Sequence, residues 1–301
     1  MKKINLIFLA LFFLVSFQSL AAEKPSKDSF SFVFMTDIHL QPERNATKGF
    51  LQAIETVNNL KPDFVLTGGD LIMDALGQTY SRSDSLYDLY ETTIQQFDMP
   101  VFNTMGNHEI FGLYEESGID PTHKEYGKKM YENRLNKRYY SFEYNNWHFI
   151  ILDGISYTND KHYFGLVDST QVEWLKEELK AIGKEEPVVV STHIPLLSVG
   201  NQIMHGPAEA FKESSIITNA RDIINILENY NVKIVLQGHL HFLEDINYNG
   251  IHYITGGAVC AGWWKGPRFG MEEGFLLIKV KDDDFSWKYI DYGWEVGGSI
   301  Q

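Results

Sequence analysis

The sequence predicts an α/β protein whose strands and helices stack in layers. Short apolar runs typical of strands alternate with amphipathic helical patterns in the earlier part of the chain, and strand patterns dominate after Phe242. Early alternation followed by a strand-rich segment is typical of an α/β layered sandwich. No linker-like composition and no internal repeat interrupts this pattern, so we expect one domain over residues 28–301.

The elements of the first half follow from local patterns. An aromatic-rich run predicts the first strand, and Phe50, Ile54 and Val57 share one face of the first helix. Asn145-Asn146 lies between two strand patterns and predicts a hairpin turn. We expect strands at 30–35, 62–67, 100–104, 139–144 and 147–152, and helices at 46–60 and 80–97.

The second half begins with a helix and becomes rich in strands. Asp168 and Gln171 have the spacing of a capping pair, and Leu175 and Leu179 lie on the apolar face of the helix that follows. A second helical pattern carries Ile223 and is followed by a short apolar strand. We expect helices at 168–182 and 223–230, and strands at 188–192, 233–236, 243–248, 251–255, 275–280 and 285–290.

Residues 1–22 have the organisation of a secretory signal peptide. Lys2 and Lys3 precede an apolar run at 4–15, and small residues follow it. The run is shorter than the ~20 residues that span a bilayer, which favours a cleaved peptide over a transmembrane anchor. We expect cleavage after Ala21 or Ala22 and an exported protein, periplasmic or secreted, with no transmembrane segment in the mature chain.

The composition excludes several kinds of partner and site. The formal charge is −14, and loss of residues 1–22, with two lysines and no acid, makes it −16. Nucleic acid is therefore not an expected partner, because it is bound by an excess of Lys and Arg. The single cysteine, Cys260, excludes an internal disulfide and a cysteine-rich zinc module.

Side chains of the metal-ligand type follow five of the predicted strands. Ligand crevices of open α/β sheets lie beyond the carboxyl ends of the strands, so we expect these side chains at one edge. Residues i and i+2 of an extended chain point the same way, which lets the paired motif residues converge. The motifs are Asp37-Ile38-His39, Gly69-Asp70, Gly106-Asn107-His108-Glu109, His193 and Gly238-His239-Leu240-His241.

The donor set suits two metal ions better than one. Four imidazoles, two carboxylates and the amide oxygen of Asn107 favour zinc, manganese or iron over calcium, and they are too many for one tetrahedral ion. Two ions about 3.5–4 Å apart hold both the attacking and the leaving oxygen of a phosphoryl group. Each motif alone is weak evidence, but five in succession point to a dinuclear centre.

In this order, the motifs resemble the signature of the calcineurin-like metallophosphoesterase superfamily over roughly residues 30–260. The resemblance implies a four-layer α/β/β/α sandwich with two mixed sheets and a dinuclear site at the carboxyl edge of the strands. It also implies attack of a metal-bound hydroxide on a phosphate ester, with His108 facing the substrate to protonate the leaving oxygen or stabilise phosphoryl charge. By resemblance, Asp37, His39 and His241 bind the first metal, Asn107, His193 and His239 bind the second, and Asp70 bridges both.

Departures from subfamily patterns narrow the expected activity. Met105 and Met73 replace an Arg and an Asp of the Ser/Thr protein phosphatases, and Met73 also replaces a metal-binding Tyr of the purple acid phosphatases. The remaining resemblance is to an exported bacterial branch that includes cyclic-nucleotide phosphodiesterases, most of which carry Asp where this chain has Glu109. We expect a small phosphate ester as substrate and two divalent ions (Mn, Fe or Zn) as cofactors, with monoesters and diesters both open.

A glycine-rich segment, Gly256 to Gly270, follows the last motif. Trp263, Trp264, Lys265 and Arg268 in this segment either line the substrate cleft or pack as a structural loop.

Five histidines lie outside the motifs. His148 and His252 fall in strand patterns and are expected to be structural, whereas three near predicted loops are candidates for substrate contact: His123, His162 and His205.

Two functions of other classes also fit parts of the sequence. A metal-binding protein without turnover would keep the fold but is expected to lose ligands, and all seven positions carry suitable side chains. A membrane-tethered structural protein would retain residues 1–22 as its anchor.

Overall fold

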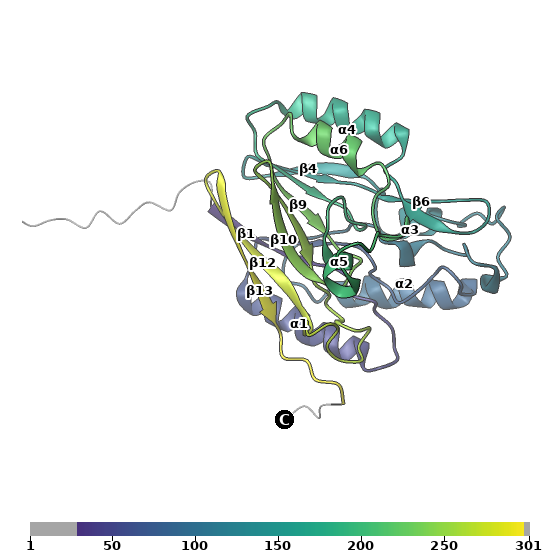
Figure 1. Cartoon of the computed structure of the whole chain (residues 1–301). Coiled ribbons are helices and arrows are strands. Elements are labelled where there is room, and N and C mark those ends of the chain that lie inside the picture. The colour runs from purple at the N-terminus through teal and green to yellow at the C-terminus, as the bar shows by residue number, and fades with distance from the viewer. Residues whose placement is uncertain (1–28, 298–301) are drawn as a thin grey trace, which may run out of the picture.

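The computed structural model describes residues 29–297, and the predicted signal peptide lies outside the described residues. Two mixed sheets pack face to face, with helices α1 and α2 on the outside of one sheet and α4 and α6 on the outside of the other (Figure 1). The four-layer α/β/β/α sandwich is therefore confirmed. Within residues 29–297, no helix combines the length and the apolar character needed to cross a membrane.

The first sheet is built around β1, whose alternating side chains serve two layers. Phe32 and Phe34 belong to the aromatic core between the sheets, while Val33 and Met35 belong to the core that contains the helices. β1 pairs in parallel with β2 and antiparallel with β12. The sheet order is β13-β12-β1-β2-β3, with β1 at Ser29–Met35, β2 at Phe64–Thr67, β3 at Val101–Phe102, β12 at Gly274–Lys281 and β13 at Asp284–Asp291.

The second sheet is parallel in its centre and antiparallel at both edges. The predicted hairpin between β4 and β5 is confirmed, because Asn145 and Asn146 are left-handed with φ of 47° and 63°, as a tight hairpin turn requires. The order is β10-β11-β9-β8-β5-β4, with β4 at Tyr140–Tyr144, β5 at Trp147–Ile151, β8 at Val188–Ser191, β9 at Val232–Gln237, β10 at Leu243–Tyr248 and β11 at Ile251–Gly256.

The main helices begin and end close to the predicted positions. The Asp168 side chain accepts a hydrogen bond from the Gln171 N–H as expected, but the buried Gln171 side chain bonds the backbone of Asp153. α2 ends before residue 97 because the last N–H groups switch to carbonyls three residues back. The helices are α1 at Ala46–Leu60, α2 at Tyr80–Ile94, α4 at Ser169–Ile182 and α6 at Ala220–Leu227.

Several short elements were not predicted, because they are too short to show a periodic pattern. They lie in the connections that surround the carboxyl ends of the strands. They are α3 at Lys129–Arg134, α5 at Gly200–His205, the paired strands β6 at Ile155–Tyr157 and β7 at Tyr163–Gly165, and 3₁₀ turns at Asn107–Glu109 and Glu115–Ser117.

Candidate metal centre

The seven predicted ligands come together beyond the carboxyl ends of five strands. β1, β2 and β3 of the first sheet and β8 and β9 of the second each lead into one motif, so the centre lies where the two sheets meet. Six of the seven side chains are buried and His239 is partly buried. They form two groups: Asp37, His39, Asp70 and His241 are the first group, and Asp70, Asn107, His193 and His239 are the second group.

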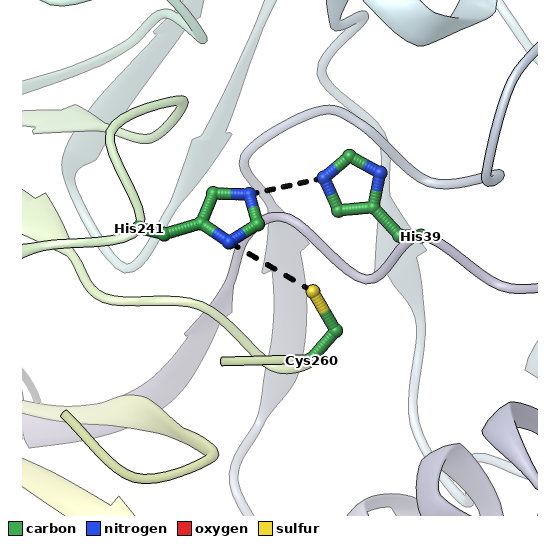
Figure 2. A group of neighbouring side chains, drawn as sticks. All are labelled: His39, His241 and Cys260. Carbon is green, nitrogen blue, oxygen red and sulfur yellow. Dashed lines mark hydrogen bonds between the residues drawn. The ribbon is translucent and has the colours of Figure 1, made fainter. Parts of the chain in front are cut away.

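In the first group, two imidazoles face each other across a carboxylate. Nε2 of His39 lies 3.1 Å from Nε2 of His241 (Figure 2), and the latter lies 3.3 Å from Oδ1 of Asp37. Nε2 of His39 also lies 3.6 Å from Oδ2 of Asp70. Four nitrogen and oxygen donor atoms therefore surround one small volume.

The second group converges on the same oxygen of Asp70. Oδ2 of Asp70 lies 3.1 Å from Nε2 of His193. That nitrogen also lies 3.2 Å from Oδ1 of Asn107 and 3.3 Å from Nδ1 of His239. One carboxylate oxygen thus faces both groups, while Oδ1 of Asp70 is fixed by the backbone N–H of His108 at 2.9 Å.

The donor chemistry of both groups fits divalent metal ions. Nδ1 of His241 donates to the Ala261 carbonyl, and Nδ1 of His193 donates to the Gly68 carbonyl. Carbonyl oxygens only accept, so each ring keeps its proton on Nδ1 and turns the lone pair of Nε2 into the group. Lone pairs held this close repel one another unless a cation lies between them.

The ligands reach the centre through turns rather than through extended chain. Asp37 and His39 have φ of 54° and 46°, and His239 and His241 have φ of 70° and 50°. The expectation that i and i+2 residues of extended chain carry the pairs is therefore wrong, because β1 and β9 end before the motifs begin. Left-handed backbone at non-glycine residues is strained and concentrates at functional sites.

A comparison with known protein families agrees with this geometry. The family model of the calcineurin-like phosphoesterases matches residues 30–243. The chain belongs to this family. It is a phosphoester hydrolase, as the motifs predict.

Named relatives and solved structures are consistent with the family. The chain is 26% identical over 263 residues to a 3′,5′-cyclic-nucleotide phosphodiesterase of Nostoc sp., covering 83% of this chain and 87% of the relative. It is 22% identical over 245 residues to the 3′,5′-cyclic adenosine monophosphate phosphodiesterase CpdA of Escherichia coli K12, covering 75% and 74%. A dimetal phosphatase from Danio rerio shares the fold with a TM-score of 0.65 at 16% identity, over 88% of this chain and 96% of that one.

The charges around this phosphoesterase centre favour the metal-binding protonation state at Asp37 and His239 and oppose it at His193. Burial raises the pKa of Asp37, but His241 and His193 outweigh burial and leave that pKa at about 2. Burial and the neighbouring His193 lower the pKa of His239 to about 4. Burial also lowers the pKa of His193, yet Asp70 and Asp37 raise it to about 9, so a metal ion must displace a proton there.

Glu109 is the functional residue whose role sequence reasoning missed. Its Oε1 accepts hydrogen bonds from the N–H groups of Leu71 at 2.8 Å and Ile72 at 3.2 Å, and its Oε2 accepts from Asp70 at 3.0 Å and Gly106 at 2.6 Å. Burial and the charge of Asp70 raise the pKa of this carboxyl to about 7. Glu109 therefore joins the Asp70 turn to the Asn107 turn, and only its position in the Gly-Asn-His-Glu motif could have pointed to it.

Glycine at 106 is required by the same close approach. A Cβ at this position would lie 2.1 Å from the Asp70 backbone nitrogen and 2.2 Å from Oδ1 of Asp70. The two turns could not then hold their ligands side by side.

His108 lies beside the centre with one nitrogen occupied. Nδ1 donates to the Met73 carbonyl, which fixes the ring, and Nε2 lies 3.8 Å from Oδ2 of Asp70 at the partly exposed mouth of the site. His39, Asp70 and His108 are nevertheless close enough to form a third metal-binding combination. Metal content of a His108 variant decides between these roles.

Cys260 lies beside His241 at the edge of the first group (Figure 2). Its Sγ is 4.0 Å from Nδ1 of His241, while Nε2 of the same ring faces His39. Burial raises the pKa of this thiol well above its ordinary value, which keeps it protonated. The thiol packs against His241, and His39, His241 and Cys260 form a further metal-binding combination.

A cleft of about 520 Å³ opens over the centre. Some side chains of the glycine-rich segment line this cleft and others do not. Trp263 and Arg268 line the cleft. Trp264 is buried instead, with Nε1 3.0 Å and 3.1 Å from the carbonyls of Ile38 and His39, and Lys265 is exposed outside the lining. The segment is therefore structural through one tryptophan and faces the cleft through the other.

The loop histidines also divide. His205 lines the cleft, and its contact with substrate stays a prediction. His162 borders a separate surface depression, and His123 packs against Phe111 and Tyr80, so neither of these two histidines lines the cleft. His252 is held by Asp245 and Asn247 on its sheet, which suits a structural role.

Proposed function

We propose that this protein is an exported, dinuclear metallophosphoesterase that hydrolyses small phosphate esters. The observation that carries the proposal is the single oxygen of Asp70, which lies 3.6 Å from His39 and 3.1 Å from His193 and so belongs to both ligand groups. Export is supported by the organisation of residues 1–22.

The ligand roles follow from the two groups. Asp37, His39 and His241 would hold one divalent ion of Mn, Fe or Zn, Asn107, His193 and His239 would hold the other, and Asp70 would bridge them. When bound, such ions activate a water molecule and offset the negative charge of the phosphate.

His108 is proposed to supply the proton that the leaving oxygen needs. The Met73 carbonyl holds Nδ1, so the ring stays oriented with Nε2 at the mouth of the cleft. A proton carried on Nε2 would pass to the alkoxide as the ester bond breaks, or would stabilise charge on the phosphoryl oxygens.

Diester specificity is the second candidate, and the names of the relatives favour it. Several are cyclic-nucleotide phosphodiesterases, at 22–26% identity. A panel of phosphomonoesters, phosphodiesters and cyclic nucleotides, assayed with manganese, zinc and iron, separates the candidates by their relative kcat/KM. Absence of hydrolysis for every ester with every metal would contradict the proposed function.

The bridge is tested by Asp70→Asn. Because one oxygen serves both groups, we expect this variant to bind fewer than two ions and to lose turnover, measured by elemental analysis and by the ester panel. Asp74→Asn is the matched control, since Asp74 lies nearby outside both groups and should keep both ions. Two tightly bound ions in the Asp70 variant would refute the bridge.

A further inference from the structure

The side chain of Arg268, in the lining of the cleft, has no carboxylate partner within residues 29–297. Arg82, Arg134 and Arg138 each hold carboxylates, whereas Arg268 takes part in none of the ion pairs among residues 29–297. Its Nε is buried and has no hydrogen-bond partner within the same residues. A buried donor without an acceptor costs free energy, which an incoming acceptor would recover.

The guanidinium is nevertheless held in one place. Its Cζ lies 4.4 Å above the ring of Trp263 and 5.1 Å from the ring of Phe269, which are cation–π distances. The backbone of Arg268 exchanges two hydrogen bonds with Met271, at 3.0 Å and 2.8 Å. The side chain is thus oriented by stacking, which leaves the N–H fork available.

Trp263 places this cation next to the first ligand group. Its ring centroid lies 4.6 Å from that of His241 and 6.1 Å from that of His39. Trp263, Trp264 and Phe269 all have left-handed backbone, with φ of 56°, 63° and 51°, which bulky side chains rarely adopt. The buried Trp264 anchors the loop, and the left-handed backbone at Trp263 turns its ring toward the ligands.

We propose that Arg268, stacked on Trp263, is an oxyanion-binding residue of the cleft that takes a phosphate or carboxylate oxygen of the substrate. A planar guanidinium fork matches such oxygens in a bidentate geometry. This proposal rests on the proposed function for its substrate class. The oxygen belongs either to the phosphoryl group at the centre or to a second anionic group of the same molecule.

Binding of two non-hydrolysable probes tests the proposal without turnover. Inorganic phosphate carries one anionic group, and phosphonoacetate carries two. Calorimetric titration of the metal-loaded protein should show that Arg268→Gln weakens binding of at least one probe by about 10- to 100-fold, the loss expected for hydrogen bonds to a charged group. If the binding of both probes is weakened equally, Arg268 binds the phosphoryl oxygen. If only the binding of phosphonoacetate is weakened, Arg268 binds the second anionic group.

Lys265→Gln is the matched control, because it removes the same charge from an exposed position of the same loop. Its binding of both probes should stay within about 2-fold of the unchanged protein, since exposed charges are screened. Equal affinities in the two variants would overturn the proposal. Should Arg268→Gln lose metal, Arg268→Lys keeps the charge without the fork, and loss of metal there too would make Arg268 structural and refute the proposal.

Because these titrations need no hydrolysis, they separate the two hypotheses. Weakened phosphate binding in a protein that cleaves no ester would support Arg268 and contradict the proposed function. Unchanged binding of both probes by Arg268→Gln in an active enzyme would contradict the role of Arg268 and support the proposed function.

Discussion

Several side chains of this centre bond a backbone group with one polar atom and face another ligand with a second polar atom. His193 and His241 each give Nδ1–H to a backbone carbonyl and turn Nε2 toward a carboxylate, and Asp70 gives one oxygen to the His108 N–H and the other to both groups. The hydrogen bond to the backbone therefore positions the atom that faces the ligands. For each histidine it fixes the tautomer as well as the direction of the ring.

His108→Ala tests the distinction between a ligand and a proton donor. We expect turnover to fall by about 10²–10⁴ with both metals retained, because Nδ1 is occupied by the Met73 carbonyl and Nε2 lies 3.8 Å from Oδ2 of Asp70. Rate measurements and metal analysis of the same preparation decide the matter, with His162→Ala, at a separate surface depression, as a control that keeps both properties. Loss of an ion in the His108 variant would make His108 a ligand.

Glu109→Gln tests the carboxylate that joins the two turns. An amide offers one oxygen to four N–H groups, so at least one donor loses its acceptor and we expect the free energy of unfolding to fall by about 1–3 kcal/mol. Urea denaturation measures the change, and Glu116→Gln on an exposed turn is the control. Equal stability of both variants would show that Glu109 is not a structural clamp.

At the scale of elements, the glycine-rich loop is fastened to the first helix. Trp264 lies over Gly49 of α1, where a Cβ would come 2.2 Å from Cζ3 of the indole, and its Nε1 lies 3.0 Å from the Ile38 carbonyl. A helix that covers the sheet thereby also sets the position of the loop that lines the cleft.

Gly49→Ala is expected to destabilise the protein although alanine favours helices. Overpacking against the buried Trp264 should cost about 1–3 kcal/mol, more than the ~1 kcal/mol gained in helix propensity. Thermal unfolding measures the net effect, with the exposed Lys48→Ala as the control on the same helix. A more stable Gly49 variant would mean that the indole moves aside freely.

At the scale of the whole molecule, the two sheets are joined by an aromatic core and by the candidate centre. Phe32 and Phe64 of the first sheet stack at 5.0 Å, and Phe149 of the second lies 5.4 Å from Phe32. The ligands come from loops of both sheets, so bound metal would add a second connection at their carboxyl edge.

Chelation should therefore lower the melting temperature. Metal at 100 times its Kd stabilises the folded state by about 2.7 kcal/mol, which a chelator removes. Calorimetry with and without EDTA measures the shift, and Asp70→Asn should show little of it. An unchanged melting temperature in the unsubstituted protein would argue against tightly bound metal.

The positions of the main strands along the chain and the ligand set could be predicted from the sequence, but the order of the strands in the sheets and the connections could not. The motif residues were recognisable because each follows an apolar run that ends in glycine or a polar turn residue. Elements such as β6, β7 and α5 were missed because three to six residues show no period, and their conformation depends on the surfaces they cover.

What the sequence determined by itself is the chemistry: seven donors at strand ends, in an order that belongs to one family. The resemblance already implied that Asp70 bridges both groups. Tertiary structure alone decided that Oδ2 is the oxygen that faces them, that Glu109 ties two turns together, and that Trp263 faces the cleft while Trp264 is buried. The physical reason is that strand ends follow from local hydrophobic patterns, whereas left-handed turns, shared oxygens and stacked rings depend on contacts between residues more than two hundred positions apart.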